Sequence, residues 1–446
     1  MNNAEWTSRI GFILAASGSA IGLGAIWKFP YMAGMNGGGV FFILFILFTV
    51  IIGTPILLAE FVIGRKGKAD AITAYKNIAP NSSWHWVGYL GTIVSFILLS
   101  FYSVVGGWIL SYLTRSVTGA LSGKTQSQYE ELFVSLISNP WEVLIAQFIF
   151  ILMTAYVVQG GIQKGIEKAS RYMMPLLFVF FLVLVIRSLT LDGAMEGVLF
   201  LLKPDWNYLS GHTILLALGQ AFFALSVGVS VMVTYASYLS KKENLVRSAF
   251  SVAGLNIFIS LLAGLVIFPA VFALGFTPGE GPGLVFVVLP AVFNELSFGG
   301  FFLVIFLVLL LFATLTSAFS ILEILVAVLT KNKENKRKNT TFVAAFIVFL
   351  AGIPSALSFG IWSEIRFFNK TFFDLADFIV TNIGLPTGAL LISIFLSFRM
   401  KKAESYQELA QGSNITSVSF NLWFICLRYI VPVAIILVFL QSLNIL

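Results

Sequence analysis

Long runs of apolar residues without charges alternate with short polar segments along the whole chain. A helix needs roughly 20 apolar residues to cross a bilayer, so each run is long enough to be a membrane-spanning helix. The pattern predicts eleven such helices, at residues 10–34, 39–63, 87–114, 141–159, 172–190, 212–239, 248–275, 300–330, 341–361, 372–398 and 420–445. We therefore expect an all-α polytopic membrane protein.

Basic residues are distributed unevenly between the segments that separate these runs. If the N-terminus is cytoplasmic, 19 Lys and Arg residues fall on the inner side and six on the outer side, while Lys28 and Arg428 lie in or near spans. An excess of Lys and Arg marks cytoplasmic loops. We expect a multi-pass protein of the inner (plasma) membrane, with the N-terminus in the cytoplasm and Leu446 outside the cell.

Composition narrows the function classes further. Hydrophobic residues make up 58% of the 446 and charged residues 11%, which is too apolar for a soluble enzyme. The lone Cys426 excludes a disulfide framework, and His85 and His212 are too far apart in sequence to indicate a metal cluster. Because the net charge of +7 resides in the loops, we expect a lipid bilayer as a partner and no nucleic acid. The small-molecule substrate expected as a second partner rests on the motifs of the chain and not on its charge. We expect a monomer or a weak homodimer.

The runs fall into two blocks, residues 10–188 and 212–398, with five runs in each. An odd number of spans per block inverts the second block relative to the first. This is the layout of transporters with inverted repeats, in which the first helix of each half is interrupted near the bilayer midplane. We expect a first repeat over 1–190, an extracellular connection over 191–211, a second repeat over 212–398, and an inner loop with an eleventh helix over 399–446.

Helix-weakening residues stand in the middle of the first span of each block. They are Gly18, Gly22 and Gly24 in the first span, and Ser226 and Gly228 in the sixth. Unwound backbone inside a membrane must be hydrogen-bonded or coordinated, and a bound ion or ligand can do this. Close helix packing through small residues is the alternative explanation for either span. Two breaks at matching positions of inverted halves favour a binding site.

Several longer motifs occur in order along nearly the whole chain. They are GSAIGLGAIWKFPYMAGMNGGGVFF (18–42), PILLAEFVIGR (55–65), LGQAFFALSVG (218–228), GPGLVFVVLPAVF (281–293) and LTSAFS (315–320). These motifs resemble the signature stretches of the neurotransmitter:sodium symporter family, and are most similar to its prokaryotic amino-acid transporters, including the eleven-helix kind. The resemblance implies a sodium-driven symporter, not an enzyme. It also implies an inverted-repeat (5+5) fold with discontinuous helices 1 and 6 and one extra C-terminal helix, in which a bundle of helices 1, 2, 6 and 7 rocks against a scaffold.

The family's second sodium site has its counterparts in this chain. The resemblance assigns to it the carbonyls of Gly18, Ile21 and Ala313 and the hydroxyls of Thr316 and Ser317. Neutral carbonyl and hydroxyl oxygens suit a hard monovalent cation, because they replace its hydration shell without adding charge. The alternative is that the two hydroxyls bond back to their own helix.

The family's first sodium site is incomplete in this chain. Ala25 stands where the family usually has an asparagine and Ala224 where it has a threonine or serine, which leaves Ser19, Ala20 and Asn256 as contributors. Two side-chain oxygens are therefore missing. We expect this site to be weak or absent, so that one sodium ion is coupled to each substrate.

The family's chloride site is incomplete as well. Gln220, Asn256 and Ser260 match it, but Phe45 replaces a tyrosine and Ala224 a serine. An anion that loses two hydrogen-bond donors in a low dielectric is poorly held. We expect no tight chloride binding.

The resemblance also assigns a substrate site. Gly22 stands where the family's aminergic members carry an aspartate, which makes room for a substrate that brings its own carboxylate. That carboxylate would meet the N–H groups of Leu23 and Gly24 and the Tyr102 hydroxyl. Its ammonium group would face the Ala20 and Phe223 carbonyls and the Ser226 hydroxyl. The full expected set is Ser19, Ala20, Gly22, Leu23, Gly24, Leu98, Tyr102, Val105, Phe223, Ser226, Val229, Ser317 and Ile321.

Four further residues match the family's gates. Lys28 and Asp377 correspond to an outer ion pair that would close over the substrate, although a static structural ion pair is the alternative. Trp6 and Tyr238 correspond to the plug on the inner side.

The family's inner salt bridge has no counterpart here. Asn3 and Lys331 occupy its two positions, so this salt bridge cannot form. Two acidic residues within the spans, Glu60 and Glu323, are expected to hold loops or unwound amides by hydrogen bonds rather than to relay protons.

Three hypotheses of function follow. The first is sodium-coupled import of a neutral hydrophobic or aromatic amino acid by alternating access. The second keeps the fold but moves a neutral aromatic molecule without a carboxylate, coupled to a single sodium ion. The third, a membrane enzyme or a passive channel, is disfavoured, because the chain offers no nucleophile–base pair or metal cluster and a channel does not need paired breaks with two gates.

Overall fold

The structure is a computed structural model that describes residues 5–276, 283–331 and 334–442. Within these ranges the regular structure is helical apart from two isolated bridges. Ten helical segments of the described chain are long and apolar enough to cross a membrane. The sixth predicted span is not among them because it is broken into two short helices, so the predicted runs and the observed segments correspond one to one.

The first five spans consist of straight helices and of helices joined by π-helical turns. They are α1 (Arg9–Leu23), η1 (Gly24–Lys28) and α2 (Phe29–Met35); α3 (Gly39–Phe48), η2 (Thr49–Gly53) and α4 (Thr54–Gly67); α6 (His85–Val117); α8 (Pro140–Val158); and η3 (Ile162–Glu167) with α9 (Lys168–Leu189).

The remaining six spans follow the same scheme. They are α11 (Gly211–Ala224) and α12 (Val231–Ser237); α13 (Leu245–Ala273); α15 (Gly299–Thr330); α16 (Arg337–Leu357); α17 (Phe372–Phe378), η7 (Ile379–Gly384), α18 (Leu385–Ile394) and η8 (Phe395–Arg399); and α20 (Ser417–Ile425), η9 (Cys426–Ile430) and α21 (Val431–Ser442).

Short helices occupy the connections between spans. Local capping explains two of them: the Asp70 carboxylate accepts from the first amides of its helix, and Thr125 and Gln128 form a reciprocal capping box. The connecting helices are α5 (Ala71–Ile78), α7 (Gln126–Ser138), α10 (Ala194–Leu202), η4 (Trp206–Tyr208), η5 (Leu284–Val288), α14 (Leu289–Asn294), η6 (Glu334–Lys336) and α19 (Lys402–Ala410).

The fifth span begins ten residues earlier than its apolar run predicts, at Ile162 instead of 172. The polar residues Gln163, Lys164 and Glu167 interrupt the apolar pattern although the helix continues through them. Glu167 is buried there because it accepts hydrogen bonds from the backbone and side chain of Thr7. A tertiary contact therefore overrides the hydropathy pattern at this boundary.

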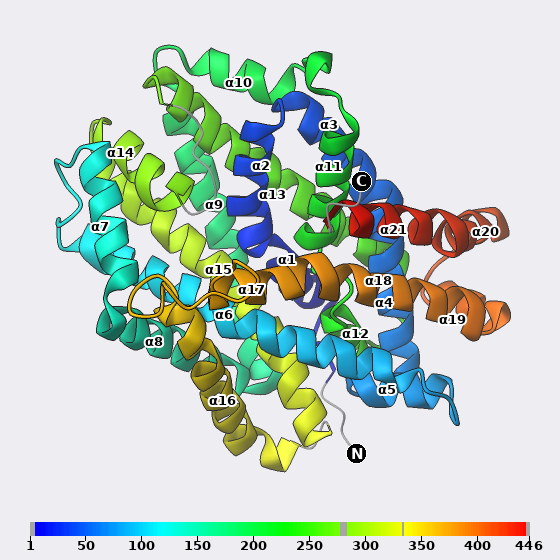
Figure 1. Cartoon of the computed structure of the whole chain (residues 1–446). Helices are drawn as coiled ribbons and strands as arrows, with labels where there is room; N and C mark the ends of the chain where they lie inside the picture. The colour runs from blue at the N-terminus through cyan, green and yellow to red at the C-terminus, as the bar shows by residue number, and fades with distance from the viewer. Residues whose placement is uncertain (1–4, 277–282, 332–333, 443–446) are drawn as a thin grey trace.

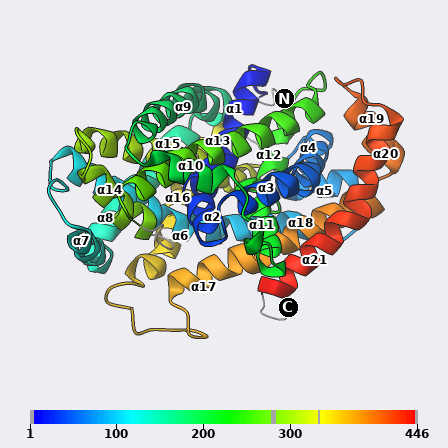
Figure 2. The same cartoon turned by 90° about the horizontal axis from the view of Figure 1, so that it is seen from above.

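Helix α1 lies near the centre of the molecule and packs against α9, α13 and α15 (Figure 1). Helix α4 packs against α12, and α18 against α21. Viewed from above, α7 lies at one edge and α19 and α20 at the opposite edge (Figure 2). Both broken spans thus pack against neighbouring helices: α1 against α9, α13 and α15, and α12 against α4.

Side chains of the eleventh span donate hydrogen bonds to backbone carbonyls of the second span near Pro55. Pro55 has no N–H to offer the Ile51 carbonyl one turn earlier, and an unpaired carbonyl is costly inside a membrane. The Cys426 thiol donates to the Ile51 carbonyl at 3.2 Å, and the Trp423 indole donates to the Pro55 carbonyl at 3.1 Å. Side chains of η9 and α20 therefore satisfy backbone groups of η2 and α4.

Candidate functional site

The first span breaks at Gly22, whose φ of −2° and ψ of −151° are not helical. A Cβ atom at this position would lie 2.2 Å from Ser317 Oγ and 2.9 Å from Tyr102 Oη. Glycine is therefore needed here for close approach as well as for the change of direction. The break brings the backbone of the first span against α6 and α15.

The sixth span breaks between Ala224 and Val231. Ser226, Gly228 and Ser230 have φ values of 52°, 97° and 58°, so the chain cannot continue as a helix. The Gly228 N–H donates to the Glu60 carboxylate at 2.7 Å. Glu60 thus contacts an unwound amide, as the sequence led us to expect for a structural carboxylate.

A small enclosed cavity of about 30 Å³ lies between the two breaks. Twelve of the thirteen residues of the expected substrate set line it. Val105 does not: it is buried in α6 and lies outside the lining. Leu385 lines the cavity and was missed, because it lies in the tenth span, where none of the recognised motifs falls.

The polar groups around this cavity bond to one another. Leu23 N–H donates to the Tyr102 hydroxyl at 3.4 Å. The hydroxyls of Ser226 and Ser317 both donate to the Ser19 carbonyl, at 3.2 and 2.9 Å. Donors and acceptors therefore converge on one end of the cavity, while Leu98, Val229, Ile321 and Leu385 supply apolar walls.

Neutral oxygens cluster beside the cavity where α15 meets α1. The Thr316 hydroxyl lies 3.1 Å from the Gly18 carbonyl and 3.0 Å from that of Ala313. The Ser317 hydroxyl lies 3.2 Å from the same Gly18 carbonyl. Four of the five expected sodium ligands are thus within hydrogen-bonding distance of one another. The fifth, the Ile21 carbonyl, accepts from the Gly24 N–H.

The expected position of the first sodium site holds an amide instead. Asn256 Nδ2 donates to the Ala20 carbonyl at 3.1 Å and to the Ala224 carbonyl at 2.8 Å. Two carbonyl oxygens require a donor or a cation between them, so the NH₂ end of this amide must face them when no cation does. Ala25 is fully buried nearby and offers no side-chain oxygen.

The expected chloride position adjoins an aromatic cluster. Phe45 packs on Phe29 with ring centroids 5.0 Å apart, and both belong to a buried apolar group that includes Ala224. Gln220 uses its amide N–H on the Gly24 carbonyl at 2.8 Å, which leaves its Oε1 without a partner. The buried Gln220 oxygen is an acceptor and offers no hydrogen bond to an anion.

The sequence profile of the Sodium:neurotransmitter symporter family matches residues 3–132 and 133–446 of this chain. The chain belongs to this family. Members of the family are sodium-dependent transporters, so the protein is a sodium-dependent symporter of the membrane and not an enzyme.

Individual relatives agree with this membership. An uncharacterized sodium-dependent transporter of Bacillus subtilis, YhdH, is 55% identical over 99% of this chain and 98% of its own length. The sodium-dependent serotonin transporter of Drosophila melanogaster is 25% identical over 98% of this chain and 76% of its own. The crystal structure of MhsT in complex with L-phenylalanine has a TM-score of 0.91 and 43% identity, and the match covers 98% of this chain and 99% of that one. The symporter therefore has the inverted-repeat fold, with discontinuous helices 1 and 6 and one extra C-terminal helix.

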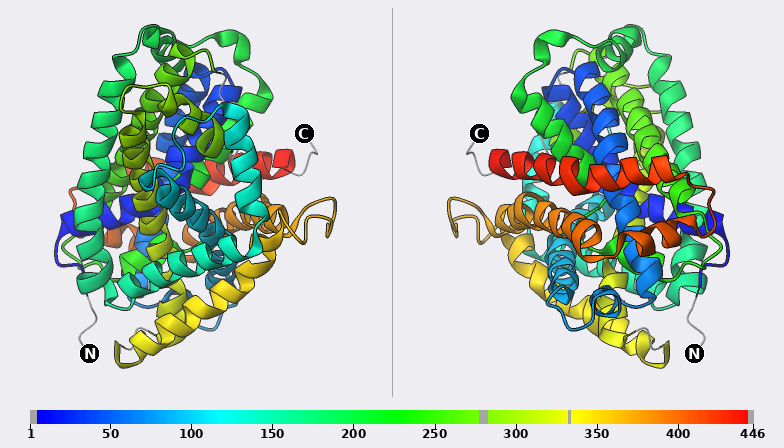
Figure 3. Two further views of the ribbon diagram at one scale, coloured as in Figure 1. Left: turned by 90° about the vertical axis from the view of Figure 1, so that its left-hand side faces the viewer. Right: turned by 90° about the vertical axis from the view of Figure 1, so that its right-hand side faces the viewer.

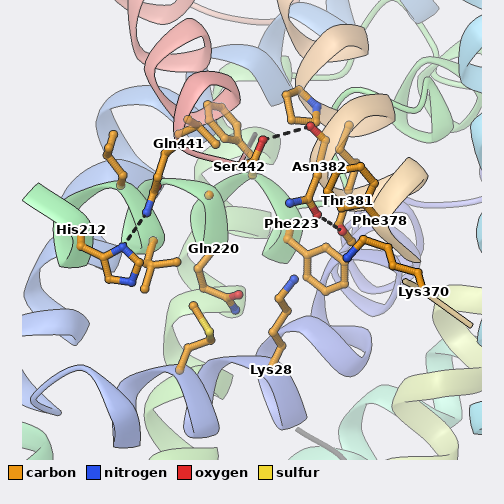
Figure 4. Close-up of a pocket in the computed structure, with 18 residues that line it drawn as sticks. Lys28, His212, Gln220, Phe223, Lys370, Phe378, Thr381, Asn382, Gln441 and Ser442 are labelled. Carbon is orange, nitrogen blue, oxygen red and sulfur yellow. Dashed lines mark hydrogen bonds between the residues drawn. The ribbon is translucent and has the colours of Figure 1, made fainter. Parts of the chain in front are cut away.

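A second pocket of about 390 Å³ adjoins the small cavity (Figure 4). Phe223 and Leu385 line both spaces and form the partition between them. Lys28 Nζ lies 4.1 Å from the centroid of the Phe223 ring. The expected ion pair between Lys28 and Asp377, both in the described chain, is not formed. The ammonium is stabilised on the aromatic face instead.

The end of the molecule where the N-terminal segment lies, expected to be the inner side, carries a layer of aromatic and charged groups. Trp6 Nε1 donates to the Tyr235 carbonyl at 2.9 Å, and Trp6 N–H donates to the Tyr238 carbonyl at 3.3 Å. The Tyr238 hydroxyl donates to Glu323 at 2.9 Å, and Glu323 forms a buried ion pair with Arg337. The symporter thus brings Trp6 and Tyr238 together as expected and adds Arg337, which the motifs did not indicate.

Asn3 and Lys331 stand at the two positions of the family's inner salt bridge. Asn3 lies outside the described residues, and Lys331 is exposed at the end of α15. Glu167 holds the N-terminal segment from the other side, since it accepts from Thr7 and Ser8 and pairs with Arg171.

Proposed function

We propose that the symporter imports a neutral hydrophobic or aromatic amino acid together with sodium by alternating access. The observation that carries the proposal is the coincidence of two sites at the broken helices. Twelve residues of the expected substrate set line one cavity, and a cluster of neutral oxygens shares Ser317 with it. An ion held there would stabilise the break of the first span in the shape that binds substrate.

The chemistry of the cavity supports the substrate class. The glycine at position 22 leaves no carboxylate to receive a cationic amine, while Leu23 N–H and the Tyr102 hydroxyl offer donors to a substrate carboxylate. The walls are aliphatic or aromatic. The related MhsT structure contains L-phenylalanine, which belongs to the same class. Since the cavity measures about 30 Å³, Phe223 and its neighbours must move apart for a substrate to enter.

We propose one sodium ion per substrate and no requirement for chloride. The oxygen cluster around Thr316 would hold one ion, whereas Ala25 and Ala224 offer no side-chain oxygen to a second ion. One charge crossing the membrane is worth roughly 2.3 kcal/mol per 100 mV, which alone supports a concentration ratio of about 50.

We also propose the orientation and assembly that the sequence predicts. The N-terminus would lie in the cytoplasm of the cell and the C-terminus outside its inner (plasma) membrane, with repeats over 1–190 and 212–398. The protein would act as a monomer or a weak homodimer. The excess of basic residues on one side supports this orientation.

Uptake into proteoliposomes tests the function. Radiolabelled phenylalanine should accumulate under an inward sodium gradient with a Hill coefficient for sodium near one, and replacing internal and external chloride with gluconate should leave the rate unchanged. Equal uptake when potassium replaces sodium would refute the proposal.

The Asn256 contacts also favour a second candidate. A sodium ion in the first site would neutralise a substrate carboxylate, so its replacement by an amide suits a neutral aromatic molecule without that group. Competition separates the two candidates: phenylalanine should displace the label far better than its decarboxylated or side-chain-only analogue if an amino acid is the substrate. The reverse order would favour the second candidate.

A further inference from the structure

A groove of about 630 Å³ opens on the flank of the molecule, apart from the transport path. Its walls are η2 with the start of α4, the first turns of α13, and α20 with residues 413–416 before it. The right-hand view of Figure 3 faces α20 and α21 on this flank, drawn in red. The groove shares no lining residue with the small cavity or with the second pocket, of about 390 Å³.

Polar and apolar residues occupy opposite ends of the groove. Asn244, Arg247 and Thr416 lie where α13 and α20 begin, both on the same side of the membrane. Val50 and Leu422 lie deeper along the spans and are 41% and 64% exposed. A ligand that fills the groove therefore needs one polar end and one apolar end.

The depth of the groove matches one leaflet of a bilayer. Its lining extends along α20 into η9 as far as Cys426, nine residues beyond the start of the helix at Ser417. Nine residues of helix rise about 14 Å, and one leaflet contributes about 15 Å of hydrocarbon. An acyl chain that enters beside Thr416 would thus end near the bilayer midplane.

The charge at the polar end is uncompensated. Arg247 is exposed, and its guanidinium forms no ion pair with any described residue. The lining contains no Asp or Glu. The Glu408 carboxylate, which does not line the groove, is paired with Arg65 and Lys241. Arg247 is therefore available for a phosphate from outside the chain.

We propose that this groove is a binding site for an anionic glycerophospholipid, with the phosphate on Arg247 and one acyl chain along Val50 and Leu422. Basic pockets between helices at the cytoplasmic face are suited to anionic lipid headgroups. The assignment to the inner leaflet rests on the proposed orientation of the symporter, whereas binding at the groove does not depend on which substrate is transported.

Fluorescence quenching tests the site in the full-length protein. Trp423 lines the groove, so the difference in quenching between wild type and Trp423→Phe isolates its signal from those of the other tryptophans. In phosphatidylcholine vesicles, dibrominated phosphatidylglycerol should half-quench Trp423 at a mole fraction about fivefold lower than dibrominated phosphatidylcholine does. Arg247→Gln should abolish this preference.

A matched charge variant provides the control. Lys242→Gln removes a positive charge from the same loop but from a residue that does not line the groove, and should retain the preference. Unchanged elution and thermal unfolding of Arg247→Gln would show that it is folded. Equal quenching by both lipids in wild type, or a preference that survives Arg247→Gln, would overturn the proposal. Absence of Trp423 quenching by either lipid would also overturn it, and would indicate that a protein segment fills the groove.

Discussion

One amide group joins three membrane helices at the centre of the molecule. Asn256 projects from α13 and donates to carbonyls of the first span, at Ala20, and of the sixth, at Ala224. Its own oxygen has no partner in the described structure. A neutral donor thus fulfils the role that a cation would have between those two carbonyls. We propose that the number of coupled ions depends on this side chain.

Replacing this amide with a carboxylate tests that dependence. In Asn256→Asp, a negative oxygen would face two carbonyl oxygens, which is unfavourable unless a cation lies between them. We expect the Hill coefficient for sodium in uptake or in thermal stabilisation to rise from about one towards two. Asn256→Ala is the control, since it removes the donor without adding charge. A folded, active Asn256→Asp with a coefficient of one would contradict the idea.

Gly22 is the residue where the cavity has least room. Gly22→Ala would place a methyl group against Ser317 and Tyr102, and overpacking of this kind typically costs about 1–3 kcal/mol. We expect substrate binding to weaken at least about tenfold, as measured by equilibrium binding of labelled phenylalanine.

The control for this variant is Gly254→Ala in α13. A Cβ there would meet no atom within 4 Å, so substrate affinity should not change. Equal losses in the two variants would show that the effect is general and not a property of the break.

At the scale of elements, two buried carboxylates connect the ends of neighbouring helices. Glu167 holds the segment before α1 to η3, and Glu323 joins α15 to the start of α16 through Arg337 and to α12 through Tyr238. Both carboxylates are almost fully buried. Contacts between helix ends therefore hold together the end of the molecule where the N-terminal segment lies.

Removal of one partner should reveal the strength of these contacts. Glu323→Gln would leave Arg337, whose side chain is only 12% exposed, without its counter-charge, and breaking a buried pair costs about 3 kcal/mol. We expect the midpoint of thermal unfolding in detergent to fall by several degrees. Glu404→Gln, which breaks the half-exposed pair with Lys66, should cost less than about 1 kcal/mol. The double variant Glu323→Gln/Arg337→Gln should recover part of the loss, and no recovery would contradict this account.

Elements were more predictable from the sequence than contacts were. Hydropathy indicates each span because burial in lipid requires long apolar runs, and twelve of the residues expected from the motifs line one cavity. The positions of Leu385 in the cavity lining and of Arg337 beside Glu323 were not predicted, because they arise from packing between distant spans, which no local pattern encodes. Lys28 was paired with Asp377 by family match, but its ammonium lies over the Phe223 ring instead.

For the molecule as a whole, the distribution of basic residues makes the orientation testable. Single cysteines placed on opposite sides should react differently with a membrane-impermeant maleimide in intact cells. Arg366→Cys, in the loop before α17, should be labelled, whereas Lys242→Cys, between α12 and α13, should be labelled only after the cells are broken. The opposite pattern would invert the proposed orientation and place the lipid groove in the outer leaflet.

Such labelling experiments need a protein without its native thiol, Cys426. Because this thiol donates to the Ile51 carbonyl, the residue that replaces it matters. The Cys426 thiol donates a hydrogen bond to the Ile51 carbonyl, so alanine in its place would leave a peptide oxygen without this donor inside the membrane. Serine keeps a hydroxyl within reach of that oxygen. A cysteine-less protein with serine at position 426 should therefore remain stable on purification. One with alanine should be less stable, because the unpaired carbonyl would lie in the second span although the substitution is in the eleventh.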